Sequence, residues 1–194
     1  LDLSIANALV PNLGLGGKAT GSLDFVQASA EAFPQADARM TITGFQRSSL
    51  ATVSEPVDVV FAGRLSGSGA EARALINRGS TTVGRLQASL RPLGTGGSWA
   101  SRLMAAPLSG GIRYNGPSGV LFSLSGLAHQ QLTGPIVVAA DFGGRVSAPQ
   151  LNGLIRADNL TYDNETYGTR LSNMAIRARF NNDRLQLDSL TGRA

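Results

Sequence analysis

The chain contains no cysteine, a single histidine and few aromatic (6%) or charged (15%) residues. Without cysteine it can form neither a disulfide framework nor a zinc–cysteine site. His129 alone cannot supply a His-paired metal site or a conventional catalytic triad. No uninterrupted apolar run reaches the roughly 18 residues expected of a membrane-spanning helix. These shortages argue against most classes of enzyme and metalloprotein.

Lysine is also nearly missing, because all but one of the 17 basic residues are arginine and Lys18 is the exception. The net charge is +4, and the arginines are spread singly along the chain rather than clustered. A protein that binds nucleic acid would gather them and place aromatic residues between them. We therefore expect no nucleic-acid partner and interpret the arginines as the solvated face of a sheet.

The few groups that could carry chemistry have simpler explanations. We interpret His129 as a loop or rim residue, and Asp163 and Glu165 as a solvated hairpin end. The glycine-rich run "GLGGKA" at 14–19 lacks a Ser or Thr after Lys18 and a following helix, so we expect a turn there and not a phosphate loop. The sequence thus predicts no catalytic residue, no metal ligand and no cofactor, and we do not expect an enzyme.

Alternation of apolar and polar residues is what the sequence has in abundance, together with 24 glycines. Because successive side chains of a strand point to opposite faces, this alternation predicts amphipathic strands. Connections of hairpin length between them favour antiparallel neighbours. The predicted strands lie within residues 1–9, 21–28, 36–45, 56–67, 81–90, 132–142, 151–158, 172–180 and 184–189.

Short helical insertions interrupt this pattern. Residues 70–79 are rich in helix formers and end at Gly79, which favours a short helix. Residues 98–106 predict a better-defined helix, with Ser98 as its N-cap and Pro107 after its end, and residues 116–126 predict one more helical turn. We expect one continuous all-β domain over 1–194 and, since the chain opens inside an alternating run, a fragment of a larger protein.

An amphipathic sheet of this length must cover its apolar face. A second sheet would make a sandwich, closure would make a barrel, and folding lengthwise into a U would leave a hydrophobic groove. In the groove, the apolar phase of the strands would supply the lining. The residues expected to line it are Met40, Ile42, Val57, Val59, Phe61, Leu86, Leu132, Ile136, Val138, Ala140, Phe142, Leu151, Ile155, Met174, Ile176, Phe180, Leu185 and Leu187.

Part of the chain resembles a known family. The stretches "LTGPIVVAADFGG" at 132–144 and "PQLNGLIRADNLTY" at 149–162 are similar to the periplasmic region of TamB-like proteins, which belong to the AsmA-like superfamily. The resemblance extends over about 85–194. It implies a long antiparallel sheet curled into a U-shaped hydrophobic groove, called a β-taco.

The resemblance also implies a function. TamB-like proteins are anchored in the inner membrane of Gram-negative bacteria, span the periplasm and pair with a TamA-like outer-membrane barrel. They are implicated in phospholipid transport between the membranes and in outer-membrane protein assembly. We therefore expect phospholipid acyl chains or unfolded outer-membrane protein strands as partners. The competing hypotheses are a structural β-sandwich or β-solenoid module without lipid cargo, and a sheet edge that holds a client strand.

Overall fold

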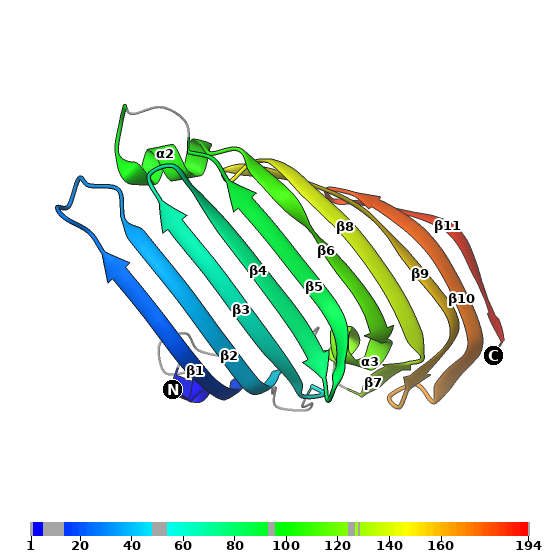
Figure 1. Ribbon diagram of the computed structural model, residues 1–194. Helices are drawn as coiled ribbons and strands as arrows, with labels where there is room; N and C mark the ends of the chain where they lie inside the picture. The colour runs from blue at the N-terminus through cyan, green and yellow to red at the C-terminus, as the bar shows by residue number, and fades with distance from the viewer. Residues whose placement is uncertain are drawn as a thin grey trace.

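The computed structural model describes residues 2–5, 14–47, 54–92, 96–123, 127 and 129–193. These residues form one antiparallel sheet of 11 strands with the order β1-β2-β3-β4-β5-β6-β8-β9-β10-β11, while β7 pairs with β9 beside this path (Figure 1). Within the described chain, β1 pairs only with β2 and β11 only with β10, so the sheet is open. Its strands bend and the sheet curls, which confirms the predicted all-β curled sheet (Figure 1).

The strands run in sequence order, and each helix interrupts the meander at one point only. The strands are β1 (Leu15–Val26), β2 (Gln35–Arg47), β3 (Val57–Ser66), β4 (Gly69–Arg78), β5 (Thr81–Leu90), β6 (Leu108–Pro117), β7 (Gln130–Thr133), β8 (Pro135–Arg145), β9 (Ala148–Asn164), β10 (Thr169–Asn181) and β11 (Arg184–Arg193). The helical segments are η1 (Leu3–Ile5), α2 (Trp99–Ala105) and α3 (Ser118–Ser123).

No second layer covers most of this sheet. The chain exposes 12025 Å², whereas a compact monomer of 20.1 kDa would expose about 8,700 Å². Among the described residues the buried apolar side chains are few, and half of them are alanines: Ala19, Ala106, Ala140, Ala157 and Ala178. The fold therefore leaves one broad face without the packed interior of a sandwich.

Helix α3 covers one part of the apolar side. Its Val120 is 2% exposed and packs with Val57, Val83 and Tyr114, which lie on β3, β5 and β6. Helix α2 instead crosses the opposite ends of the strands, next to the β3–β4 hairpin (Figure 1). Two hydrogen bonds tie its end to the β8–β9 hairpin, and one of them runs from the amide of Ser147 to the carbonyl oxygen of Met104 at 2.9 Å.

The prediction of a helix at residues 70–79 is wrong, because this segment belongs to strand β4. Over residues 70–77, Ala70, Ala72, Ala74 and Ile76 alternate with Glu71, Arg73 and Asn77, and only Leu75 departs from the period of two. The hairpins on both sides of β4 place it between β3 and β5, where its backbone groups complete both ladders. Helix propensity, a difference of tenths of a kcal/mol per residue, does not outweigh this pairing.

The beginning of the chain also differs from the prediction. Among the described residues of the predicted strand 1–9, Asp2 makes a single bridge to Lys18 and Leu3–Ile5 is a 3-10 turn. The Asp2 carboxylate accepts a hydrogen bond from the Ser4 amide at 2.8 Å, which favours the turn. The run "GLGGKA" is not a turn, because most of it belongs to β1 with a bulge between Gly16 and Lys18.

The other two predicted helical segments are confirmed, and most of the predicted strands are present. Helix α2 matches the prediction for 98–106, and the Ser98 side chain accepts a hydrogen bond from the Ser101 amide. Helix α3 lies within 116–126, of which residues 124–126 are outside the described part. Strand β5 has the predicted bounds, and the predicted run 132–142 is divided into β7 and β8 at Gly134. Strand β6 was not predicted.

Candidate functional site

The two faces of the sheet differ at every strand. Residues paired directly across an antiparallel ladder point to the same side, so the pairing register traces rows of side chains from one edge to the other. One row consists of Gly21, Met40, Phe61, Ala74, Leu86, Ile112, Ala140, Gly153, Phe180 and Leu185. The row beside it consists of Ala19, Ile42, Val59, Ile76, Gly84, Tyr114, Val138, Ile155, Ala178 and Leu187. We call the side formed by these rows the apolar face.

Most of the residues predicted from alternation lie on this face. Thirteen of them lie in the two rows or continue them at Phe142 and Leu151, which pair with each other across β8 and β9. Ile136 and Ile176 both pair with Ala157, one step further along the strands. The last three are Val57, Leu132 and Met174.

The last three of the predicted lining residues lie outside the two apolar rows. Val57 is 6% exposed and packs in the cluster under α3, so it is not open to a ligand in this conformation. Leu132 belongs to β7, beside the main path of the sheet, and Met174 pairs with the buried Leu160. Val138 lies in the row but also packs against the cluster under α3.

Sequence reasoning missed the contributions of β1, β4 and β6 to the apolar face. On β1, Leu23 and Phe25 lie on this face and are 67% and 60% exposed. Strand β11 mirrors them at the other edge, where Leu185 and Leu187 are 65% and 51% exposed. Since no further strand continues the rows in the described chain, the apolar face ends in exposed leucines at both edges.

Large side chains fill the gaps that glycines leave on the apolar face. A Cβ at Gly153 would collide with the Phe180 ring and with the carbonyl oxygen of Ala139. A Cβ at Gly110 would likewise collide with the Phe142 ring. Each aromatic ring thus occupies the space next to a glycine of the neighbouring strand.

We expect Gly153→Ala to lower the free energy of unfolding by about 1–3 kcal/mol, because the methyl group has to displace Phe180 in a filled site. Chemical denaturation monitored by circular dichroism measures this change. Gly96→Ala is the matched control, since a Cβ there has nothing within 4 Å, and it should stay within about 0.5 kcal/mol of the parent. Equal stability of the two variants would contradict the close contact of Gly153 with Phe180.

The cluster under α3 contains one ionisable side chain in its centre. Tyr114 is 3% exposed, and its hydroxyl donates a hydrogen bond to the carbonyl oxygen of Pro117 at 2.8 Å. Burial, and to a lesser extent the nearby Glu55 carboxylate, raises the pKa of Tyr114 from 10.0 to about 12. The phenol therefore stays neutral in the folded chain at pH values where it ionises in the unfolded chain.

This shift predicts an alkaline loss of stability. The contribution of Tyr114 is fully present below pH 10, where both states are neutral. This contribution is lost between pH 10 and 12, because the unfolded state releases its proton first. The resulting loss of stability is about 3 kcal/mol at most. The free energy of unfolding, measured against pH, should fall more steeply above pH 10 for the parent than for Tyr114→Phe. Parallel curves would refute the raised pKa of Tyr114.

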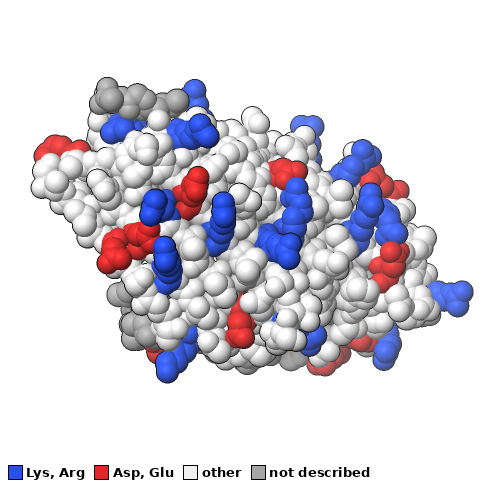
Figure 2. All heavy atoms as spheres, in the orientation of Figure 1, with Lys and Arg blue, Asp and Glu red and all other residues white. Residues whose placement is uncertain are grey.

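The opposite side of the sheet, which we call the polar face, carries the charges. Its central row is displaced by one residue in each strand from an apolar row. The row consists of Ser22, Arg39, Ala62, Arg73, Gln87, Gly111, Asp141, Asn152, Asn181 and Arg184. Figure 2 shows basic side chains gathered over the middle of this face.

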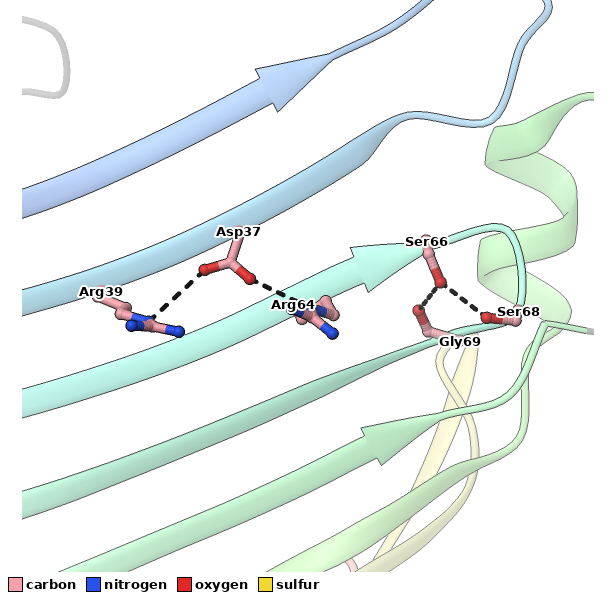
Figure 3. A network of polar contacts seen from close by, with 6 residues as sticks. All are labelled: Asp37, Arg39, Arg64, Ser66, Ser68 and Gly69. Atoms are coloured by element: carbon pink, nitrogen blue, oxygen red, sulfur yellow. Dashed lines mark hydrogen bonds and ion pairs between the residues drawn. The ribbon is translucent and has the colours of Figure 1, made fainter.

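Cross-strand ion pairs lie along the polar face. On β2 and β3, the Asp37 carboxylate lies 3.2 Å from Nε of Arg64 and 3.8 Å from Nε of Arg39 (Figure 3). On β10 and β11, Arg179 donates two hydrogen bonds to Asp188, at 2.8 and 3.0 Å, and this contact holds the pKa of Asp188 below its ordinary value. Such exposed pairs contribute little stability each but fix the side chains in place.

Two arginines make a more elaborate contact. Arg113 donates from Nη1 to the carbonyl oxygens of Ile112 (3.0 Å) and Ala140 (2.7 Å), and from Nη2 to the Asp141 carboxylate at 2.6 Å. Both terminal guanidinium nitrogens thus have a defined acceptor on β6 or β8. This arrangement joins the two strands on the polar face by side-chain contacts as well as by the ladder.

The same arrangement recurs on β9 and β10. Arg177 donates from Nη1 to the carbonyl oxygens of Ile176 and Ala157, both at 3.0 Å, and from Nη2 to Asp158 at 2.8 Å. The sequence signal is an Ile-Arg pair on one strand opposite an Ala-Asp pair on the next. The repetition of this pattern at Arg113 was visible in the sequence and would have revealed β6.

The polar face is hollowed where β4, β5 and β6 meet. A hollow of about 760 Å³ is lined there by the charged or polar side chains of Arg73, Arg85, Gln87, Ser89, Ser109, Arg113 and Asp141. A neighbouring hollow of about 450 Å³ shares Arg73, Gln87 and Ser89 with it. This site was not predicted, because evenly spaced arginines gave no indication of which ones meet in space.

Other candidates for chemistry lie outside the apolar rows and outside the hollow. His129 is exposed in the turn before β7, with Nδ1 3.8 Å from Glu165, and Asp163 lies 3.6 Å from Arg170 across the β9–β10 pair. In the described part of the chain no three His, Asp or Glu residues come together as a metal site would require. None of the helices described there has the length and apolarity needed to cross a membrane.

Comparison of the chain with protein-family models, with curated proteins and with solved structures found no match.

Proposed function

We propose that the apolar face lines an open trough for the acyl chains of phospholipids, as a segment of a TamB-like envelope protein. The observation that carries this proposal is the continuity of the face: every strand in the order β1 to β11, apart from β7, contributes apolar residues or glycine to both rows. A structural module would bury such a surface beneath a second layer, and the described residues supply only α3 for this purpose.

The dimensions and the lining suit an acyl chain. Neighbouring strands are about 4.8 Å apart, so ten strands in series extend the rows over roughly 45 Å. Each methylene that leaves water for this surface contributes about 0.8 kcal/mol. Because Ala, Val, Ile, Leu and Phe offer no hydrogen bond, the chain has no single tight site and can move from strand to strand.

The cellular setting follows from the resemblance of residues 132–162 to TamB-like proteins. In this function the segment lies in the periplasm of a Gram-negative bacterium, and its parent protein is anchored in the inner membrane. The parent moves phospholipid between the two membranes or assists outer-membrane protein assembly. A TamA-like barrel is a partner bound through other parts of the parent protein.

Lipid extraction tests the proposal. The chain, expressed with a periplasmic leader and purified without detergent, is extracted with organic solvent, and the extract is analysed by mass spectrometry. Phospholipid should be recovered in a fixed ratio to protein, and a cytoplasmic protein of similar charge purified in parallel should yield none. Absence of lipid from repeated preparations, including preparations incubated with vesicles, would favour a structural module.

The exposed edges favour a second candidate function. Among the described residues β11 pairs only with β10, so its outer edge presents unpaired backbone groups next to Leu185 and Leu187, which is the usual template for an added strand. An unfolded outer-membrane protein strand with alternating apolar residues could continue both the ladder and the apolar rows. A synthetic strand of that pattern should then protect the β11 amides from hydrogen exchange, whereas a phospholipid would leave them unprotected.

A further inference from the structure

The hollow over β4, β5 and β6 lies on the polar face, opposite the proposed trough. Its volume of about 760 Å³ falls within the range of small-molecule sites, roughly 300–1,000 Å³. Three arginines from three successive strands reach it, namely Arg73, Arg85 and Arg113. Figure 2 shows basic side chains over these strands in the middle of the visible face.

Two of these arginines lack an acidic partner. Among the described residues, Asp141 is the one acid that lines the hollow, and its carboxylate lies 2.6 Å from Nη2 of Arg113. In the described part of the chain, no carboxylate lies within 4.0 Å of the guanidinium nitrogens of Arg73 or Arg85. Elsewhere on the polar face, Arg64, Arg177 and Arg179 each hold an aspartate.

The register places like charges directly opposite each other in the hollow. Arg85 pairs with Arg113 across the β5–β6 ladder, and Arg73 is diagonal to Arg85 because Leu75 is the direct partner of Arg85. Like charges in directly opposed positions destabilise a sheet. A bound anion between the guanidinium groups would reverse this repulsion.

The surroundings add neutral donors and a shaped floor. The hydroxyls of Ser89 and Ser109 lie 2.8 Å apart, and the amide of Gln87 lines the same hollow. At the floor, a Cβ on Gly111 would lie 2.8 Å from Oδ1 of Asp141 and 2.9 Å from Nη1 of Arg113. Glycine at position 111 therefore leaves room for the contact between Arg113 and Asp141, which holds the Arg113 guanidinium group at the hollow.

We propose that this hollow is a binding site for a phosphate group carrying two or more negative charges. Planar guanidinium groups match phosphate oxygens in bidentate contacts, and the serine hydroxyls and Gln87 supply further donors. A phospholipid headgroup and a soluble phosphate compound share this chemistry. The site is independent of the trough, since its residues point to the other side of the sheet.

Isothermal titration calorimetry of the full chain with pyrophosphate at low ionic strength tests the site. The parent should bind, Arg85→Gln should weaken binding about fivefold, and Arg73→Gln with Arg85→Gln should weaken it about 25-fold. Arg184→Gln is the matched control, because it removes one charge of the polar face away from the hollow, and it should change affinity less than about twofold. Circular dichroism verifies that each variant is folded.

Equal affinity of all variants, or no binding by the parent at millimolar pyrophosphate, would overturn the proposal, because it would leave only the diffuse attraction of a basic chain. A second arm identifies the natural source of the phosphate. Phosphatidic acid vesicles that displace pyrophosphate from the parent, where phosphatidylcholine vesicles do not, assign the site to a headgroup. Displacement by neither assigns it to a soluble compound. Lipid extraction can fail while this site is confirmed, and the reverse, so the two proposals are tested separately.

Discussion

The double substitution of Leu185 and Leu187 by aspartate is expected to abolish the retention of phospholipid while the chain stays folded. Both side chains belong to the apolar rows and are more than half exposed, so little packing is lost. Two carboxylates at the end of the trough would have to lose water when an acyl chain arrives, at a cost of several kcal/mol. Retention measured by mass spectrometry should fall at least about tenfold, since each 1.4 kcal/mol is a factor of ten.

The control for this variant is the residue between the two leucines. Gln186 pairs with Arg179 on the polar face, and Gln186→Asp adds a carboxylate to the same strand on the other side. It should retain lipid as the parent does. If both variants lose lipid equally, the effect comes from added negative charge and not from the apolar face.

The second large effect is expected at helix α3, where Val120→Asp should strongly destabilise the fold. Val120 is 2% exposed and packs with Val57, Val83 and Tyr114. A carboxylate there has no basic partner within the cluster, and an uncompensated buried charge costs about 3–5 kcal/mol. A domain of ordinary stability has only about 5–15 kcal/mol in total, so the midpoint of thermal unfolding should drop sharply.

A surface position separates this effect from a general intolerance of aspartate. Val60 is 40% exposed on the polar face of β3, and Val60→Asp should cost about 1 kcal/mol through strand propensity. Calorimetry of both variants measures the difference. A Val120→Asp chain as stable as Val60→Asp would mean that α3 does not cover the apolar face in solution.

Alternation in the sequence predicted which way most side chains face, because the period of two is a property of the strand itself. Met40 and Ile42 on β2, or Phe180 on β10, lie on the apolar face as expected. The pattern failed where composition was given more weight than period, as in β4, whose alanines were interpreted as helix formers. It also failed in β6, where Gly110 and Gly111 obscured the alternation.

Features that depend on packing between distant segments could not be predicted. Val57 is buried in the cluster with Val120 of α3, which follows it by about sixty residues in the chain. The hollow on the polar face depends in the same way on the register that brings Arg85 beside Arg113. Single-sequence patterns contain no information on these contacts.

Photo-crosslinking along the two edge strands tests the central claim most directly. A benzophenone amino acid is introduced singly at positions 22–25 of β1 and 185–187 of β11, where every side chain is exposed, and lipid adducts are counted by mass spectrometry. Adducts at positions 23, 25, 185 and 187, without adducts at 22, 24 and 186, are the predicted result. Adducts at similar yield on both faces of these strands, or no adducts at any position, would contradict a phospholipid trough on the apolar face.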